Sequence, residues 1–191
     1  MSRNLRVQAA RLLTVDRQWS ARVARAAASH PLAYRASVIL AHAGDGLFCL
    51  AVGLLVLLAG SRDHRNALLQ IAASVLAAAA LAAGVKFSVR RERPQGTDST
   101  RWSAMSTRDP YSFPSGHAAR AACIATGVSV LYPAATWPCM VWAAGVCLAR
   151  VTLAAHYLLD VLVGVVLGAL VARLMSGVWP SLLLFYEGLP L

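Results

Sequence analysis

The chain has 191 residues, of which 58% are hydrophobic and 14% charged, and its mean hydropathy is +0.59. Soluble domains are ~45–50% apolar, so this composition excludes an ordinary soluble domain and indicates a membrane protein of one domain. The net charge is +10, and Lys86 is the one lysine among 18 basic residues. Because the arginines lie between and beside apolar runs, we expect anionic lipid headgroups or a phosphate group as partners, and no nucleic acid.

The first 36 residues form a basic leader. Seven arginines are spread through residues 1–36, with no compact apolar segment or cleavage site of a secretory signal. In residues 5–28, apolar side chains alternate with arginines at roughly helical spacing. We expect an amphipathic helix on the membrane surface, with Trp19 as an interfacial anchor. The alternative is a solvated, partly disordered leader.

Five apolar runs follow, each close to the ~17–25 residues that cross a bilayer as a helix. They cover about residues 37–60, 66–88, 117–133, 135–153 and 157–178. We therefore predict an all-α fold, a polytopic membrane helix bundle with about five transmembrane helices, in which residues 37–191 form the membrane domain. The tail, 179–191, contains two prolines and is too short to span, so we expect it at the interface.

The alternation of the spans gathers ionisable residues at one membrane face. Six of them lie at span ends on this side: Lys86, Arg93, His117, Arg150, His156 and Asp160. The link between the second and third spans, about 89–116, is long and rich in arginine, and such loops are usually functional. We expect its polar part, 95–112, to gate entry to a site on this face.

Two local patterns supply positive charge and backbone donors to this face. Lys86 and Arg93 lie seven residues apart in KFSVRRERP. If the helix continues past Lys86, seven residues are two turns, so both cations share a helix face. In PSGH, Ser115 is a suitable N-cap for the next helix, and Gly116 lets a ligand approach the backbone. The free N–H groups at this helix start form an anion site.

A third pattern supplies a histidine with a carboxylate. His156 and Asp160 are i, i+4 neighbours in RVTLAAHYLLD, so the carboxylate can hold the imidazole in one tautomer. With His117 and the cations they predict a phosphate pocket, in which one histidine attacks phosphorus and the other protonates the leaving oxygen. Each pattern alone has a plainer interpretation: a snorkelling helix flank, an ordinary helix start, or a structural pair. Their joint occurrence favours the pocket.

The three patterns, in this order over residues 86–160, resemble the type 2 phosphatidic acid phosphatase superfamily, whose motifs read K-x6-R-P, P-S-G-H and S-R-x5-H-x3-D. The resemblance implies that His156 is a nucleophile forming a phosphohistidine, that Asp160 orients it, and that His117 is the general acid. It implies a phosphate cradle of five residues: Lys86, Arg93, Ser115, Gly116 and Arg150. It implies no metal and no other cofactor. Ala149 stands where the family usually has serine, so we expect weakened binding or altered leaving-group tolerance.

Further ionisable residues lie near this face. His42 and Asp45 lie near the start of the first span, where ionisable groups are costly and usually functional. We expect them to border the substrate entrance or to contact the arginines of the cradle. The alternative is an interfacial helix end in water with a local glycine break. For Arg120, one turn after the histidine of PSGH, we expect added charge in the pocket or a pair with Asp109.

The resemblance implies an integral membrane lipid phosphatase of the cell (inner) membrane. Candidate substrates are polyprenyl diphosphate or phosphate, phosphatidic acid and phosphatidylglycerol phosphate, with a polyprenyl carrier as the first hypothesis. Two alternatives keep the fold: a lipid phosphotransferase using the same phosphohistidine, and a non-catalytic lipid-binding protein. Vanadium haloperoxidases share the pocket but are soluble, so five apolar runs argue against them. Arginine counting favours a cytoplasmic site, whereas many family members act on the outer face.

Overall fold

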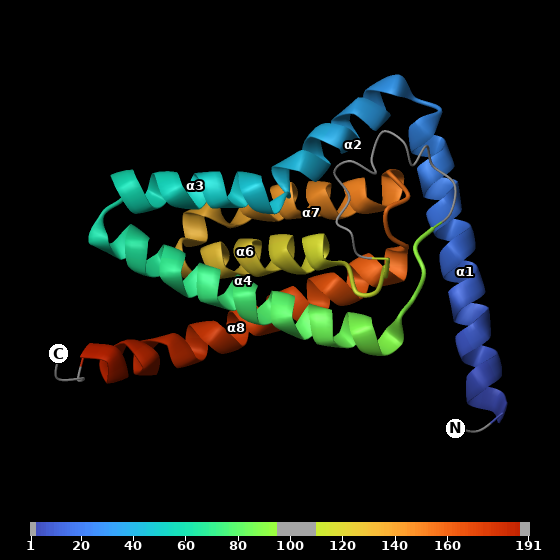
Figure 1. Ribbon diagram of the computed structural model, residues 1–191. Coiled ribbons are helices and arrows are strands. Elements are labelled where there is room, and N and C mark those ends of the chain that lie inside the picture. The colour runs from blue at the N-terminus through green and yellow to red at the C-terminus, as the bar shows by residue number, and fades with distance from the viewer. Residues whose placement is uncertain (1–2, 95–109, 188–191) are drawn as a thin grey trace.

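Helices form nearly all of residues 3–94 and 110–187, which are the residues that the computed structural model describes (Figure 1). The helices are α1 (Arg3–Ala28), α2 (Pro31–Ala43), α3 (Gly46–Ala59), α4 (Arg62–Val89), α6 (Gly116–Leu131), the short 3-10 helix η1 (Pro133–Ala135), α7 (Thr136–Thr152) and α8 (Leu158–Glu187). The prediction of an all-α membrane helix bundle is confirmed. Asp109 and most of the expected gating segment, 95–109, lie outside the described residues.

Among the described residues, three single helices are long and apolar enough to cross a membrane. They are Arg62–Val89, Pro133–Thr152 and Leu158–Leu184. A fourth span is formed if α2 and α3, which are bent by 53° at their junction, are taken together. α6 corresponds to the expected span at 117–133, but its 16 residues are slightly short of the ~17–25 that cross a bilayer alone. The chain is an integral membrane protein; its inner-membrane location and its orientation stay predictions.

The first predicted span, 37–60, is not one helix. α2 ends at Ala43, and α3 begins after Asp45, which is extended. At this break a Cβ on Gly44 would lie 2.4 Å from a methyl carbon of Val146, so only glycine lets α2 approach α7 this closely. The indole of Trp142 donates to the Ala43 carbonyl at 3.3 Å, which satisfies an acceptor that the break leaves open.

We expected the tail, 179–191, to be too short and too broken to span, but residues 179–187 continue the last helix. α8 runs through Pro180 to Glu187, and the apolar span includes Leu184. Proline has a helical φ and removes only one backbone donor. Membrane helices tolerate this loss where local adjustments satisfy the freed carbonyl.

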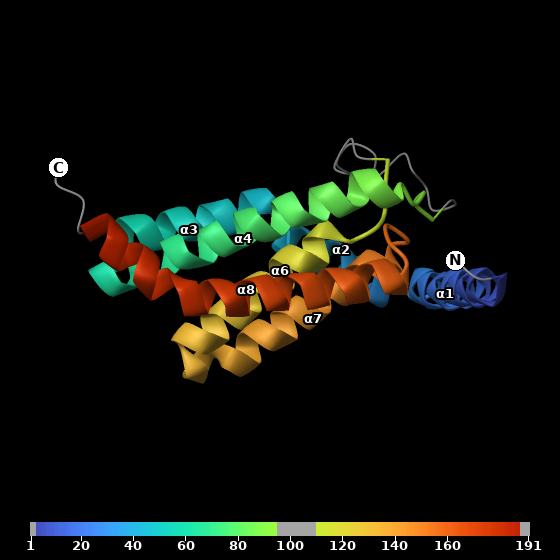
Figure 2. The same ribbon diagram turned by 90° about the horizontal axis from the view of Figure 1, so that it is seen from below.

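α6 is the central helix and packs against α4, α7 and α8 (Figure 1, Figure 2). Its contact with α8 is made through Gly164 and Gly168, which are four residues apart and share a helix face. A Cβ on Gly168 would lie 2.0 Å from the Ala119 carbonyl oxygen, and one on Gly164 would lie 2.5 Å from the Ser115 carbonyl oxygen. The two helices therefore touch backbone to backbone, which places the PSGH segment beside the start of α8.

α1 lies across the end of the bundle where α4 ends and α8 begins (Figure 1, Figure 2). It contacts α2, α7 and α8 and is not one of the apolar spans. Trp19 is exposed, and the Arg22 guanidinium stacks on its ring at 5.0 Å. Residues 3–28 are helical, and their place on the membrane surface stays a prediction. The division into 1–36 and 37–191 stays a prediction.

We expect Gly168→Val to destabilise the protein because its Cβ would meet the α6 backbone, which cannot move aside as a side chain can. Overpacking of this kind costs about 1–3 kcal/mol or more. Gly177→Val, in the same helix, is the matched control, since a Cβ there meets nothing within 4 Å. Thermal unfolding in detergent, followed by circular dichroism, measures both. Equal melting temperatures for the two variants would show that α6 and α8 are not in close contact.

Candidate active site

The predicted site residues lie at the end of the bundle that α1 crosses. Each belongs to a helix end or the segment beside one: Lys86 in the last turn of α4, Arg93 after it, Ser115, Gly116 and His117 at the start of α6, Arg150 in the last turn of α7, His156 just before α8, and Asp160 in its first turn. Helix ends expose free main-chain groups, so charged side chains and backbone donors gather here.

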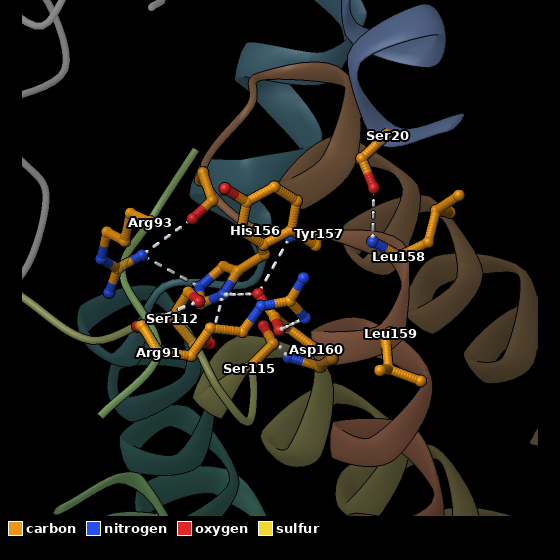
Figure 3. A network of polar contacts seen from close by, with 12 residues as sticks. Ser20, Arg91, Arg93, Ser112, Ser115, His156, Tyr157, Leu158, Leu159 and Asp160 are labelled. Carbon is orange, nitrogen blue, oxygen red and sulfur yellow. Dashed lines mark hydrogen bonds and ion pairs between the residues drawn. The ribbon is translucent and has the colours of Figure 1, made fainter. Parts of the chain in front are cut away.

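His156 is almost fully buried, with 1% of its surface exposed. Figure 3 shows it beside Arg93, Ser112 and Asp160. Its Nδ1 lies 2.8 Å from the Ser112 carbonyl oxygen, so Nδ1 carries the hydrogen and donates it. Its Nε2 lies 3.2 Å from a guanidinium nitrogen of Arg93, from which it accepts. The Oδ2 atom of Asp160 is 3.7 Å from Nδ1. Asp160 is therefore the nearest negative charge to the ring, while the hydrogen-bond acceptor that sets the tautomer is the carbonyl.

Ser112 reaches His156 because the segments on either side of 95–109 pair with each other. Glu92 and Tyr111 form an antiparallel bridge, and the Ser112 N–H donates to the Arg91 carbonyl at 2.7 Å. The Ser112 hydroxyl also donates to the Glu92 carbonyl at 3.0 Å. The sequence did not indicate this role for Ser112, because only its main-chain carbonyl acts on the histidine.

Arg93 does not share a helix face with Lys86, because the helix ends before it reaches Arg93. α4 ends at Val89, and Arg90 has a left-handed φ of 51°, which turns the chain out of the helix. Arg93 follows in an extended segment, where its guanidinium donates to the Ala155 carbonyl at 3.0 Å as well as to His156. The turn at Arg90 therefore carries the second cation of the motif across to the histidine.

Asp160 is completely buried and makes two short contacts. Its Oδ1 lies 2.7 Å from an Arg91 nitrogen, and its Oδ2 accepts from the Tyr157 N–H at 3.0 Å. The Arg91 guanidinium also stacks on the Tyr157 ring at 4.0 Å. Nothing in the sequence singles out Arg91, because this arginine is one of the six spacer residues between Lys86 and the Arg-Pro pair.

The start of α6 fits its predicted part in the site. The Ser115 hydroxyl accepts from the Ala118 N–H at 3.4 Å, which confirms the N-cap, and the Ser115 N–H donates to the Asp160 carbonyl at 2.9 Å. Gly116 borders a cavity of about 290 Å³, and a Cβ there would meet nothing within 4 Å. The polar end of the cavity is lined by Lys86, Gly116 and Arg120, and its apolar wall by Val75, Ala79, Ala82 and Ala83.

The second histidine also has a carboxylate partner. The Nε2 atom of His117 lies 3.0 Å from Oδ1 of Asp45, whose Oδ2 lies 3.1 Å from Nδ1 of His42. Asp45 thus contacts His117, the predicted general acid. From the sequence we expected Asp45 to border the substrate entrance or to contact the arginines of the cradle. Arg120 donates to the Gly44 carbonyl at 3.1 Å and lines the cavity. A pair with Asp109 lies outside the described residues, and added charge in the pocket stays a prediction.

Arg150 is a buried cation, with 5% of its surface exposed. Within the described part of the chain no carboxylate lies within ion-pair distance of it, and its Nε has no hydrogen-bond partner. A buried charge without a counter-ion is costly, so this position favours an anionic ligand. Its neighbour Ala149 packs in an apolar cluster with Ala41 and Leu153. In residues 3–94 and 110–187, no three His, Cys, Asp or Glu side chains gather to hold a metal ion.

Comparison with known proteins identifies the family. The chain is similar in structure to a transmembrane PAP2 type phosphatidylglycerolphosphate phosphatase from Bacillus subtilis, with a TM-score of 0.68 and 23% identity, over 89% of this chain and 87% of that chain. It is also similar to LpxE from Aquifex aeolicus, with a TM-score of 0.59 and 20% identity, over 84% and 93% of the two chains. The family model of the PAP2 superfamily matches residues 67–182, which contain all three motifs and more than half of the chain. The protein therefore belongs to the PAP2 superfamily and has the fold of its membrane lipid phosphatases.

Proposed function

We propose that this protein is a lipid phosphatase that hydrolyses the phosphomonoester or diphosphate of a membrane lipid through a phosphohistidine on His156. The geometry of His156 carries the proposal: Nδ1 is tied to a carbonyl, and Nε2 faces the guanidinium of Arg93. The unpaired, buried Arg150 and the free N–H groups at the start of α6 add binding groups for a phosphate.

In the first step, Nε2 of His156 attacks phosphorus, the N–P bond forms, and the bond to the leaving oxygen breaks. The hydrogen on Nδ1 stays on its carbonyl acceptor, and Asp160 stabilises the positive charge that develops on the ring. His117 protonates the leaving oxygen, and Asp45 holds that ring in place. In the second step, water attacks phosphorus, gives its proton to His117, and displaces His156.

Three cations face the phosphate in this mechanism: Lys86, Arg93 and Arg150. A transferring phosphoryl group carries its charge on its non-bridging oxygens, and fixed cations stabilise that charge in the transition state. The positive charge needed for catalysis is therefore present in the side chains, and we propose a reaction that needs no metal ion.

A lipid substrate is supported by the cavity beside Gly116. Its cationic end lies at the site, and its wall of alanine and valine follows α4 into the apolar span. An amphiphile fits this arrangement, with its phosphate at the cations and its chain along α4. The Bacillus subtilis neighbour is a phosphatidylglycerolphosphate phosphatase by name, so we include that lipid with phosphatidic acid and polyprenyl phosphates.

Burial prepares His156 as a nucleophile. Burial is the main reason why the pKa of His156 falls from 6.5 to about 4. The positive charges of Arg93 and Arg150 also lower this pKa, and together these effects outweigh the opposite influence of Asp160. His156 is therefore neutral at physiological pH, and its Nε2 lone pair is available for attack.

The central test is phosphate release from a panel of lipid phosphates and diphosphates, in detergent with EDTA. We expect wild type to release phosphate and to form an acid-labile phosphoenzyme. His156→Ala removes the nucleophile and should lower kcat at least about 10³-fold. His64→Ala is the control, because His64 pairs with Ser61 at the other end of α4. Full activity of His156→Ala would contradict the mechanism, and release only in the presence of an acceptor lipid would indicate a phosphotransferase.

A bulky residue in the cavity should discriminate against long lipid chains. Ala79→Phe fills the apolar wall, so we expect KM for a long-chain lipid phosphate to rise at least about tenfold, since each buried CH₂ contributes ~0.8 kcal/mol. Hydrolysis of a short, water-soluble alkyl phosphate should stay unchanged. Ala80→Phe is the control. Ala80 follows Ala79 in α4 and is exposed, but it does not line the cavity. Equal effects on both substrates would contradict a chain-binding role.

The depressed pKa of His156 predicts how stability depends on pH. Between pH 6.5 and about 4 the unfolded chain binds this proton and the folded chain does not, so stability is fully present above pH 6.5 and falls as pH approaches 4. His156→Gln lacks this titration. We expect its melting temperature in detergent to fall less than that of wild type over this range. Parallel curves would show that His156 is not buried in its neutral form.

A further inference from the structure

We propose that Asp16 of α1 and Arg91 are positioning residues for the reaction, acting through a buried chain of ion pairs that ends on Asp160. The inference rests on the proposed function, because it concerns the carboxylate beside the nucleophile. It makes the leader helix a component of the active site in addition to a membrane-surface element.

Arg91 bridges two carboxylates from distant parts of the chain. One guanidinium nitrogen lies 2.7 Å from Oδ1 of Asp160, and the other lies 2.6 Å from Oδ2 of Asp16. The side chains of Arg91 and Asp16 are only 9% and 8% exposed. A guanidinium is planar and presents its donors in a fixed fork, so holding one arm fixes the direction of the other. Asp16 therefore determines how Arg91 meets Asp160.

The same helix caps the start of α8. The Leu158 N–H donates to the Ser20 hydroxyl at 2.9 Å (Figure 3). The Leu159 N–H donates to Oδ1 of Asp16, also at 2.9 Å. The first N–H groups of a helix have no partner within the helix. A side chain just before the helix usually accepts a hydrogen bond from one of them. Here two of these acceptors come from α1, so α1 fixes the first turn of α8 in which Asp160 lies.

The arrangement orients Asp160 with respect to His156. Arg91 takes Oδ1, which leaves Oδ2 for the Tyr157 N–H and for the edge of the imidazole that carries Nδ1. Without Arg91, the carboxylate would lose its one cation within hydrogen-bonding distance and could rotate away from the ring. The charge that stabilises the phosphohistidine would then be misplaced, so catalysis would suffer more than substrate binding.

A purely structural role is the competing explanation, since a buried ion pair is strongly destabilising when one partner is removed. The two roles differ in kinetics. A positioning residue acts on the chemical step, so its loss lowers kcat with little change in KM. A structural residue lowers the amount of folded enzyme and leaves the kcat of the folded fraction unchanged.

The test compares Asp16→Asn with wild type in full-length protein. Asparagine can still accept from the Leu159 N–H but lacks the charge that holds Arg91. Groups that orient a catalytic ligand contribute about 10- to 100-fold in activity, so we expect kcat per folded enzyme to fall by about this factor, with KM within about threefold. Single-turnover phosphorylation of His156 should slow equally. Asp16→Glu, which restores the charge, should recover part of the rate. Asp63→Asn, at the other end of α4, is the control.

Arg91→Gln provides a second, independent arm. It should lower kcat as Asp16→Asn does, and the double variant should be no slower than Arg91→Gln, because both changes interrupt one chain. Arg90→Gln is its matched control, since the exposed Arg90 side chain contacts only the Phe87 carbonyl. If Arg91→Gln does not fold, Arg91→Lys keeps the charge but loses the two-armed geometry and is expected to lower kcat.

The outcomes separate the two proposals. A folded Asp16→Asn enzyme with the kcat of wild type would overturn the positioning role and leave the phosphatase intact. Loss of activity that follows the folded fraction alone, and returns when the assay is cooled, would also overturn it. A wild type inactive on every lipid phosphate would contradict the proposed function and this inference with it.

Discussion

The backbone contact between α6 and α8 is the constraint on which the rest of the site depends. Glycine at 164 and 168 lets the helices approach until their main chains touch, and the Ser115 N–H then reaches the Asp160 carbonyl at 2.9 Å. This contact joins the start of α6, the proposed anion site, to the turn that carries His156, the proposed nucleophile. A pair of side chains between the helices would separate the two halves of the pocket.

The charges at this end of the bundle are divided between two tasks. Asp160 and Asp45 lie beside His156 and His117, so a carboxylate is at hand to balance positive charge on either ring. Arg150 has no carboxylate partner within the described residues, which keeps its positive charge for a ligand. Arg91 contacts two carboxylates, those of Asp16 and Asp160. The guanidinium of Arg91 is the counter-charge of the completely buried Asp160. The cations that line the cavity are not needed for this purpose.

α1 packs against the start of α8, at the end of the bundle that holds the candidate site. One face of the helix carries exposed Trp19 and Arg22, while Asp16 and Ser20 face the start of α8. A short amphipathic helix gains stability from burial of its apolar side and from headgroup contacts. The same helix caps α8 and so fixes the first turn, in which Asp160 lies.

The sequence alone determined the helical membrane fold and the gathering of the three motifs, because apolar run lengths set the spans and alternating spans bring their ends to one face. It also indicated the pairing of His156 with Asp160, which is local. Tertiary structure decided the break at Gly44, which depends on Val146, and the left-handed turn that frees Arg93 from the helix. The tertiary structure also decided the contact of Arg91 with Asp16, which lie 75 residues apart in the sequence. Local residue patterns do not indicate which distant segments come into contact.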